Sequence, residues 1–351
     1  MRKITLLQIL FLFSLSILAQ IPSGYYNAAI GKTEAALKTA LFTKIGPHTE
    51  RSYNQLWTDF QTTDKRADGK VWDMYSTCTF TFGTHQDPGS GGSTECQYYN
   101  REHSFPRNWF GGEVPPMNSD LFHIYPTDKY VNNQRGNYPY GETNGSTTYS
   151  NGGKLGSCTF SGYSGMVFEP ANEYKGDFAR TYFYMVTAYE NKVANWTSEH
   201  LASNSYPAFN TWSIALLLKW TRQDPVSTKE INRNNAVYGI QNNRNPFIDY
   251  PALAEYIWGD KKGTPWSITS EINNLKIEFS VSQLPGSRII QIKSNEQNFS
   301  YRILALNGIL VDKNSSTNSN EIQTKQLNEG MYIVEVQSGN RKSIKKIVIT
   351  N

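Results

Sequence analysis

The sequence is poor in cysteine and in charge, and it has no long apolar run beyond its N-terminal segment. With 3 cysteines in 351 residues, it is not a miniprotein held together by disulfides. Charged residues make up 18% and hydrophobic residues 38%, a balance that argues against intrinsic disorder. The net charge of +4 permits a polyanionic partner without requiring one. Because no second stretch of about 18 apolar residues occurs, we expect no membrane span in the mature chain.

Aromatic residues are plentiful instead. The chain has 22 Tyr, 17 Phe and 8 Trp, which together make up 13% of its residues. Its length corresponds to about two ordinary domains. We therefore predict a folded, aromatic-rich protein with more than one domain.

The first 19 residues have the pattern of a secretory signal peptide. Arg2 and Lys3 form a basic start, Ile4 to Leu18 is almost entirely apolar, and Ala19 is a small residue suited to cleavage. An uncleaved anchor helix is the alternative, but the apolar run is short for it. We expect cleavage after residue 19 and secretion or display on the cell surface.

Export would place the three cysteines in an oxidising compartment. There one pair can form a disulfide while the third thiol is left over. The sequence does not decide which of Cys78, Cys96 and Cys158 pair, although proximity along the chain favours Cys78 with Cys96.

The region from residue 20 to about 270 has patterns typical of helices. Apolar residues recur every three to four positions from Tyr182 to Tyr189, and Ile214 to Trp220 is an apolar stretch of helical length. Ser227 and Glu230 have the spacing of a capping box, which predicts a helix that runs toward Tyr238. We predict that this region is one domain.

After about residue 270, apolar and polar residues alternate. This alternation predicts β-strands, and turn signals such as Pro285-Gly286 and Asn307-Gly308 separate them. The strands are expected at 276–281, 289–292, 301–304, 332–336 and 344–349. Their spacing is typical of a small β-sandwich, and the region has neither His nor Cys, so we expect it to carry no catalysis.

The tail resembles a known sorting signal. Its segments Tyr301-x-Ile303-Leu304-x-Leu306-Asn307-Gly308, Leu327 to Val334 and Lys345 to Val348 are similar to the type A sorting domain of the type IX secretion system. The match spans about residues 275 to 351 and lacks the usual Pro-Asn-Pro opening. It implies that residues 275–351 are a small all-β, Ig-like sandwich with the type IX secretion machinery as partner. An ordinary Ig-like binding module is the alternative.

Two short segments concentrate the residues that phosphodiester hydrolysis needs. The reaction requires a base for water, a hard cation and donors for the developing charge. His103 can be the base, because a neutral imidazole accepts a proton near pH 7. Glu102 and Asn132 offer oxygen ligands suited to a mostly hydrated Mg²⁺. Arg135 can pair with phosphate through its guanidinium.

Local structure could bring these residues together. If 101–105 and 120–126 are strands and 127–137 begins a helix, then Glu102, His103 and Asn132 would surround one spot. Asp120 and His123, on the second strand, would orient the site or its loop.

The ordered motifs identify the first domain by resemblance. Glu102-His103-x-x-Pro106, Asp120-Leu121-x-His123-Ile124-x-Pro126 and Val131-Asn132-x-x-Arg135-x-Asn137 are similar to segments of the endonuclease I family, and further family segments follow at 176–185, 230–234 and 241–251. The resemblance covers about residues 50 to 260. It implies an α+β fold: a ββα-metal (His-Me finger) nuclease domain with additional helices, followed by the sandwich.

The same resemblance implies roles for individual residues. His103 would be the general base, and Glu102 with Asn132 would hold one divalent cation per site, Mg²⁺ or else Mn²⁺ or Ca²⁺. The substrate would be DNA and also RNA, cut without sequence preference by a monomer. The loop in which some members place the phosphate-stabilising arginine is short here, so Arg107, Arg135 and Arg180 are all candidates.

Other interpretations remain open at this stage. Asp120 and His123 are as readily structural as site-orienting, and Glu230 belongs mainly to its capping box. Arg233, Arg244, Asn245 and Asp249 fit a buried polar network better than catalysis. A non-catalytic secreted module that binds glycans or nucleic acid through its aromatics is the alternative function. A zinc hydrolase is disfavoured, because no His-Glu-x-x-His motif occurs.

Overall fold

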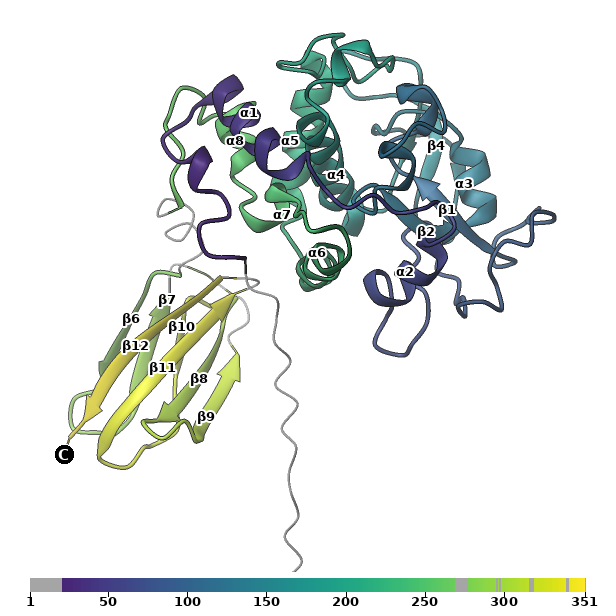
Figure 1. Cartoon of the computed structure of the whole chain (residues 1–351). Helices are drawn as coiled ribbons and strands as arrows, with labels where there is room; N and C mark the ends of the chain where they lie inside the picture. Colours follow the sequence, from purple (N-terminus) through teal and green to yellow (C-terminus); the bar gives the residue numbers. More distant parts are fainter. Residues whose placement is uncertain are drawn as a thin grey trace, which may run out of the picture.

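The computed structural model describes most of the chain after the predicted signal peptide. The predicted cleavage site and the predicted domain boundary near residue 270 lie outside the described residues. Two large hydrophobic clusters organise the described residues, one drawn from residues 25–266 and the other from residues 277–349. The N-terminal part mixes helices and strands, whereas the C-terminal part is all β (Figure 1). The described residues are 21–268, 277–294, 296, 298–315, 319–338 and 341–350.

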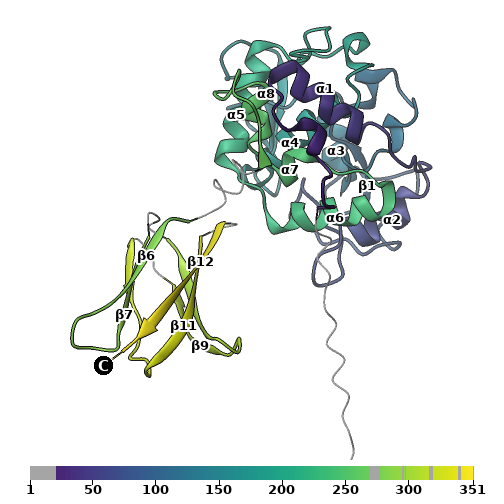
Figure 2. The same ribbon diagram turned by 60° about the vertical axis from the view of Figure 1, so that its left-hand side comes forward.

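Helix α4 (Lys175–Ala188) is the centre of the N-terminal core. All of its residues are buried, as expected of a helix that is covered on every side. Helices α1, α5 and α7 pack against it (Figures 1 and 2). The helices of this part, besides α4, are α1 (Glu34–Ile45), α2 (Leu56–Thr63), α3 (Lys129–Arg135), α5 (Thr211–Gln223), α6 (Thr228–Gln241), α7 (Pro246–Asp249) and α8 (Leu253–Ile257). Short 3-10 helices are η1 (Asn27–Ala29), η2 (Arg107–Phe110), η3 (Met117–Ser119), η4 (Asn172–Tyr174) and η5 (Val193–Asn195).

Helix α6 begins with the capping box that the sequence predicts. The Ser227 hydroxyl accepts a hydrogen bond from the Glu230 N–H at 3.2 Å, and the Glu230 carboxylate accepts one from the Ser227 N–H at 2.8 Å. Such caps satisfy N–H groups that the first helical turn leaves unpaired. The helix continues past Tyr238 to Gln241.

The predicted buried polar network is also present. Arg233 pairs with Asp64 at 2.7 Å, and Arg244 pairs with Asp249 at 2.6 Å, with all four side chains almost fully buried. The Asn245 side chain caps α7 by accepting from the Phe247 N–H. These residues tie α6 and α7 to the rest of the domain, because buried charges are tolerated when they are paired.

Two antiparallel strands and a helix form the local unit that the motifs predict. Strand β1 (Tyr99–His103) pairs with β2 (Ile124–Asp128), with Glu102 opposite Tyr125 and His103 opposite Ile124, and α3 follows directly. The bounds of both strands differ from the predicted 101–105 and 120–126, because β1 already ends at His103 and β2 starts only at Ile124. A second small sheet has the order β3 (Thr147–Thr148), β4 (Lys154–Ser157) and β5 (Met166–Glu169).

Side-chain caps set the bounds of this unit. Asp120 accepts from the Phe122 N–H at 3.0 Å and thereby holds residues 120–123 in a turn, so the strand begins after it. The Asp128 carboxylate accepts from the N–H groups of Tyr130 and Val131, so α3 starts at Lys129. A cap of this kind stabilises the folded protein by about 1 kcal/mol. At the other end, Gly136 has a φ of 53°, a backbone conformation that ends the helix at Arg135.

The C-terminal part consists of two antiparallel sheets that share one apolar cluster (Figure 2). Their orders are β10-β7-β6 and β12-β11-β8-β9. The predicted strands from 289 onward overlap β7, β8, β11 and β12, and the first predicted strand, 276–281, overlaps β6, although its residue 276 lies outside the described residues. Two strands, β9 and β10, were not predicted, because they are short or exposed edge strands without clear alternation. The bounds are β6 (Phe279–Gln283), β7 (Ile290–Ser294), β8 (Ser300–Ala305), β9 (Leu310–Ser315), β10 (Glu321–Gln323), β11 (Gly330–Ser338) and β12 (Arg341–Ile349).

Candidate active site

The motif residues converge on a pocket of about 290 Å³ in the N-terminal part. Strand β1 and helix α3 form two of its walls, and the segments around Tyr53 and Pro106 close it. The structure therefore brings Glu102, His103 and Asn132 together, as the sequence predicts. A larger cavity of about 1290 Å³ in the β-rich tail is lined by none of the predicted site residues. The pocket is lined by Tyr53, Asn100, Arg101, Glu102, His103, Pro106, Arg107, Asn132, Asn133, Gly136 and Asn137.

Glu102 is almost fully buried and is held through one of its two carboxylate oxygens. Its Oε1 accepts hydrogen bonds from the Tyr75 hydroxyl at 2.8 Å and from Arg135 at 2.6 Å. Among the hydrogen bonds of the described residues, none engages Oε2, and Glu102 lines the pocket. Burial raises the pKa of the Glu102 carboxyl, and the Arg135 guanidinium opposes that rise.

Asn132 presents its amide at the same pocket from the first turn of α3. Its Nδ2 lies 3.5 Å from the Arg101 carbonyl, to which an amide nitrogen donates. This orientation leaves the side-chain oxygen of Asn132 as an acceptor or ligand. The site thus combines one carboxylate oxygen and one amide oxygen, the donor types that hard divalent cations bind. Among the described residues, no group of three or more His, Cys, Asp or Glu side chains is arranged to hold a metal ion.

His103 is fixed in one tautomer by its contacts. Its Nε2 lies 3.2 Å from the Asn118 carbonyl, which can only accept, so Nε2 carries the proton and Nδ1 keeps its lone pair. The ring stacks on Tyr53 with centroids 5.7 Å apart. Burial lowers the pKa of His103 well below its usual value, and His123 lowers it further. The imidazole is therefore neutral at pH 7.

Asp120 and His123 lie just before β2, not on it. The Asp120 carboxylate accepts from the hydroxyls of Tyr184 and Tyr189 at 2.8 and 2.7 Å. His123 has its Nε2 2.6 Å from the Met117 carbonyl, and its ring centroid is 5.4 Å from that of His103. Both residues are buried, and their contacts hold the loop at 117–123, whose Asn118 carbonyl binds His103.

The three candidate arginines have different surroundings. Arg135 is fully buried, and besides Glu102 it donates to the carbonyls of His103 and Ser104 at 2.9 and 2.7 Å. Arg180 is also buried and forms a two-point ion pair with Glu230 at 2.5 and 2.9 Å. Neither lines the pocket, because both guanidinium groups bind protein oxygens in the core. Arg107 does line the pocket, and its half-exposed side chain pairs with Glu113 at 2.8 Å.

Arg101 is a pocket residue that the sequence analysis did not single out. Its guanidinium lies over the rings of Tyr53 and Trp57, 3.6 and 4.3 Å from their centroids, and it donates to the Tyr53 carbonyl. Its Nε has no hydrogen-bond partner among the described residues. Strand periodicity could have identified Arg101. Residues two positions apart on a strand lie on the same face, and Arg101 precedes His103 by two positions.

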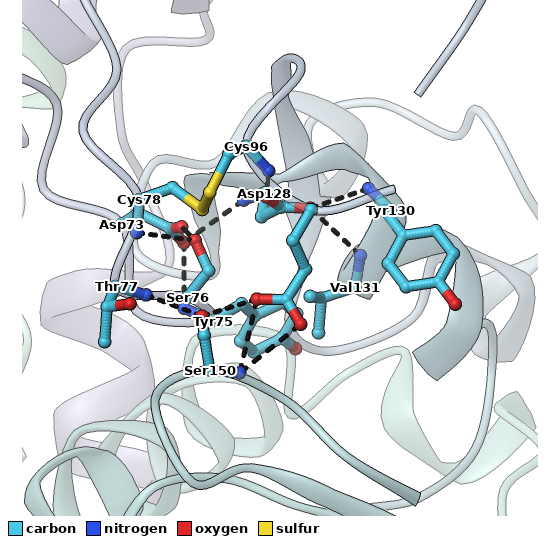
Figure 3. The surroundings of a disulfide bond; sticks show 11 residues. Asp73, Tyr75, Ser76, Thr77, Cys78, Cys96, Asp128, Tyr130, Val131 and Ser150 are labelled. Carbon is cyan, nitrogen blue, oxygen red and sulfur yellow. Dashed lines mark hydrogen bonds between the residues drawn. A yellow bond between two sulfur atoms is a disulfide. The ribbon is translucent and has the colours of Figure 1, made fainter. Parts of the chain in front are cut away.

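A disulfide lies next to the start of α3. Cys78 and Cys96 are bonded, as proximity along the chain suggested, and Cys158 is a free cysteine. Figure 3 shows Asp73 and Asp128 beside the bond. The Cys96 N–H donates to Asp128 at 2.8 Å, and Asp73 accepts from the N–H groups of Asp128 and Tyr75. The network links the disulfide to the start of α3 and, through Tyr75, to Glu102.

The sequence profile of the family described as Endonuclease I matches residues 33–252, which include the whole pocket. The chain belongs to the Endonuclease I family. One relative of this Endonuclease I protein is the extracellular ribonuclease of Bacillus amyloliquefaciens. The two are 34% identical over 250 residues, which cover 67% of this chain and 78% of the relative.

More distant relatives cover less of the chain. The Endonuclease-1 of Buchnera aphidicola is 26% identical over 133 residues, which cover 38% of this chain and 46% of the relative. The periplasmic deoxyribonuclease of Aeromonas hydrophila is 27% identical over 139 residues, which cover 39% and 50% of the two chains.

The tail belongs to a second family. Residues 284–350 match the secretion system C-terminal sorting domain, which confirms the resemblance to type IX sorting domains. No helix within the described residues is long and apolar enough to cross a membrane. The sorting domain directs this Endonuclease I protein to the type IX pathway, and hence to the cell surface or the medium.

Proposed function

We propose that this protein is a divalent-cation-dependent endonuclease that hydrolyses phosphodiester bonds of DNA and RNA without sequence preference. The observation that carries this proposal is the pocket that His103, Glu102 and Asn132 line together, in which the Asn118 carbonyl holds the proton of His103 on Nε2. Membership in a nuclease family supports it, as do relatives named as a ribonuclease and as a deoxyribonuclease.

His103 acts as the general base. Water gives up a proton to Nδ1 while its oxygen bonds to phosphorus, and the bond from phosphorus to the leaving oxygen breaks. The Asn118 carbonyl holds Nε2–H and so keeps the lone pair on Nδ1. The imidazole is ready for this step because its burial disfavours the protonated form.

Glu102 and Asn132 fit a divalent cation. The oxygen Oε2 of Glu102 is not engaged by a described hydrogen bond, and burial raises the pKa of its carboxyl although Arg135 opposes that rise. When bound, Mg²⁺, Mn²⁺ or Ca²⁺ supplies a positive charge near the phosphate oxygens. With two side-chain ligands, one cation per site would keep most of its waters.

Arg107 is the candidate for contact with the phosphate. To reach the substrate, Arg107 must leave Glu113, and exposed ion pairs of this type are worth about 0.2–1 kcal/mol, so the exchange costs little. Arg101 adds a second positive charge to the lining of the pocket. Arg135 instead positions Glu102 and the end of β1, and Arg180 ties α4 to α6.

The arrangement of β1, β2 and α3 supports the ββα-metal class of nucleases, and the two sheets of the tail support an Ig-like sandwich. We further propose that the enzyme works as a monomer, since the pocket is formed within one chain.

The test is nicking of supercoiled plasmid DNA, and degradation of RNA, by the purified protein. We expect cleavage with Mg²⁺ and complete loss with excess chelator, restored by added Mg²⁺. Binding of nucleic acid or glycans without any cleavage would instead support a non-catalytic binding module. Cleavage that persists in chelator would contradict the dependence on a cation.

A further inference from the structure

A second cavity continues the catalytic pocket along the surface. It has a volume of about 720 Å³ and shares Asn133, Gly136 and Asn137 with the catalytic pocket. A third cavity of about 750 Å³ shares Tyr163 and Glu199 with the second. The three cavities therefore adjoin one another in a row, which we call the groove, and the row starts at the proposed site of cleavage.

The groove contains a pre-built stack of aromatic rings. Tyr163 lies parallel to Trp212, with an interplanar angle of 11° and centroids 4.9 Å apart, and Trp212 stacks in turn on buried His200 at 4.6 Å. The Trp212 ring is fixed because its Nε1–H donates to the Glu199 carbonyl at 3.1 Å. Trp212 and His200 are buried, whereas Tyr163, at the other end of the stack, is partly exposed. Tyr163 lines both the second and the third cavity, the two outer cavities of the groove.

Two glycines allow the loop to hold Tyr163 in this position. Gly162 has a φ of 99°, and a Cβ there would lie 2.7 Å from the Cβ of Trp212. A Cβ on Gly165 would lie 2.2 Å from the Tyr163 hydroxyl oxygen. A side chain at residue 162 would push the loop away from Trp212, and one at residue 165 would meet the end of the Tyr163 side chain, so both glycines allow Tyr163 to lie against Trp212.

The lining of the groove beyond the catalytic pocket suits bases better than phosphates. Neither outer cavity is lined by a described lysine or arginine, and Glu199 contributes an acidic side chain. Tyr138 is 41% exposed in the second cavity. The amides of Asn133, Gln134 and Asn137 can each donate and accept hydrogen bonds, so they tolerate any base edge.

We propose that this groove binds unpaired nucleotides next to the scissile phosphate, with bases stacked on Tyr138 and Tyr163. This inference rests on the proposed nuclease function and names its preferred substrate class, single-stranded nucleic acid. In a duplex the faces of the bases are already stacked on one another and are not free to stack on tyrosines, and a groove without cations does not attract the phosphates on the outside of the duplex. Stacking on aromatic side chains is tolerant of sequence, which agrees with nonspecific cleavage.

The experiment compares the wild type with the double variant Tyr138→Ala/Tyr163→Ala on three substrates. These are a 12-nucleotide single strand, the blunt duplex of the same sequence, and bis(p-nitrophenyl) phosphate, which is too small to reach the groove. Stacking of one base on an aromatic side chain contributes about 1–3 kcal/mol to the binding free energy. The kcat/KM of the double variant on the single strand should therefore be about 10-fold or more below that of the wild type. The rates on the duplex and the small diester should stay unchanged.

Matched variants separate ring stacking from a damaged fold. Tyr138→Phe/Tyr163→Phe keeps both ring faces and should retain the single-strand rate, and Ile231→Ala removes an exposed apolar side chain on α6 and should change nothing. Equal losses on single strand and duplex, or no loss at all, would overturn the inference.

A binding measurement separates this inference from the nuclease proposal. Fluorescence anisotropy of the labelled single strand in chelator needs no catalysis, and the double Ala variant should bind about 10-fold more weakly than the wild type. If the wild type cuts nothing but shows this difference in binding, the nuclease proposal fails and the groove stands. If it cuts and both proteins bind equally, the groove fails and the nuclease proposal stands.

Discussion

His103→Ala should lower the turnover of nucleic acid cleavage by about 10²- to 10⁴-fold, the usual contribution of a positioned general base. The ring lies at the end of β1, its proton is held on Nε2 by Asn118, and Nδ1 is left to accept the proton of water. Removing the ring takes away the proton acceptor but leaves Glu102 and Asn132 in place. Steady-state cleavage of a labelled oligonucleotide, with Mg²⁺ saturating, measures the loss.

Two controls make this result specific. His85→Ala removes a histidine outside the pocket and should keep the wild-type rate. The pH profile gives a second readout, because the neutral ring is the active form and its pKa is lowered by burial. The wild-type rate should therefore persist as pH falls below about 6.5, the ordinary histidine value, and decline only at lower pH. Full activity of His103→Ala would remove His103 from the mechanism.

Glu102→Gln should raise the Mg²⁺ concentration needed for half-maximal activity by about 10-fold or more, since a charged oxygen ligand is replaced by a neutral one. Glutamine is the suitable substitution because its amide oxygen can still accept from Tyr75 and Arg135. Alanine would leave Arg135 buried without its charged partner, and such a loss costs about 3–5 kcal/mol of stability. Titration of activity with Mg²⁺, next to a thermal unfolding curve, measures both effects.

Asn132→Ala provides the matched test of the second ligand. The one described hydrogen bond of its side chain is long, at 3.5 Å, so removal of the side chain should shift the Mg²⁺ titration without lowering stability. Asn191→Ala, an exposed asparagine after α4, should titrate as the wild type does. If neither Glu102→Gln nor Asn132→Ala changes the titration, the cation binds elsewhere.

The sequence predicts the local parts of this molecule well. The capping box of α6 and the succession of two strands and a helix around Glu102 and Asn132 depend on residues close together in the chain, so spacing and periodicity reveal them. The bounds were shifted by two to four residues because side-chain caps at Asp120 and Asp128 determine where β2 and α3 begin. Alternation also found the strands that face the core of the tail, but not its exposed edge strand β9.

Tertiary partners could not be predicted from the same patterns. Arg107, Arg135 and Arg180 look alike in sequence, yet Arg135 and Arg180 are paired with Glu102 and Glu230 in the core, 33 and 50 residues away. A buried guanidinium needs such partners, and nothing local specifies them. The stack of Tyr163 on Trp212 likewise joins a loop to a helix 49 residues further on, and no local motif announces it.

The most direct test of the central claim is a crystal structure of the full chain soaked in Mn²⁺, with anomalous diffraction data collected to locate the metal. We predict one strong anomalous peak in the pocket, within bonding distance of the Glu102 carboxylate and the Asn132 side-chain oxygen, with His103 outside the coordination sphere. A peak that involves neither Glu102 nor Asn132, or a metal bound directly to His103, would contradict the proposed division between cation ligands and general base.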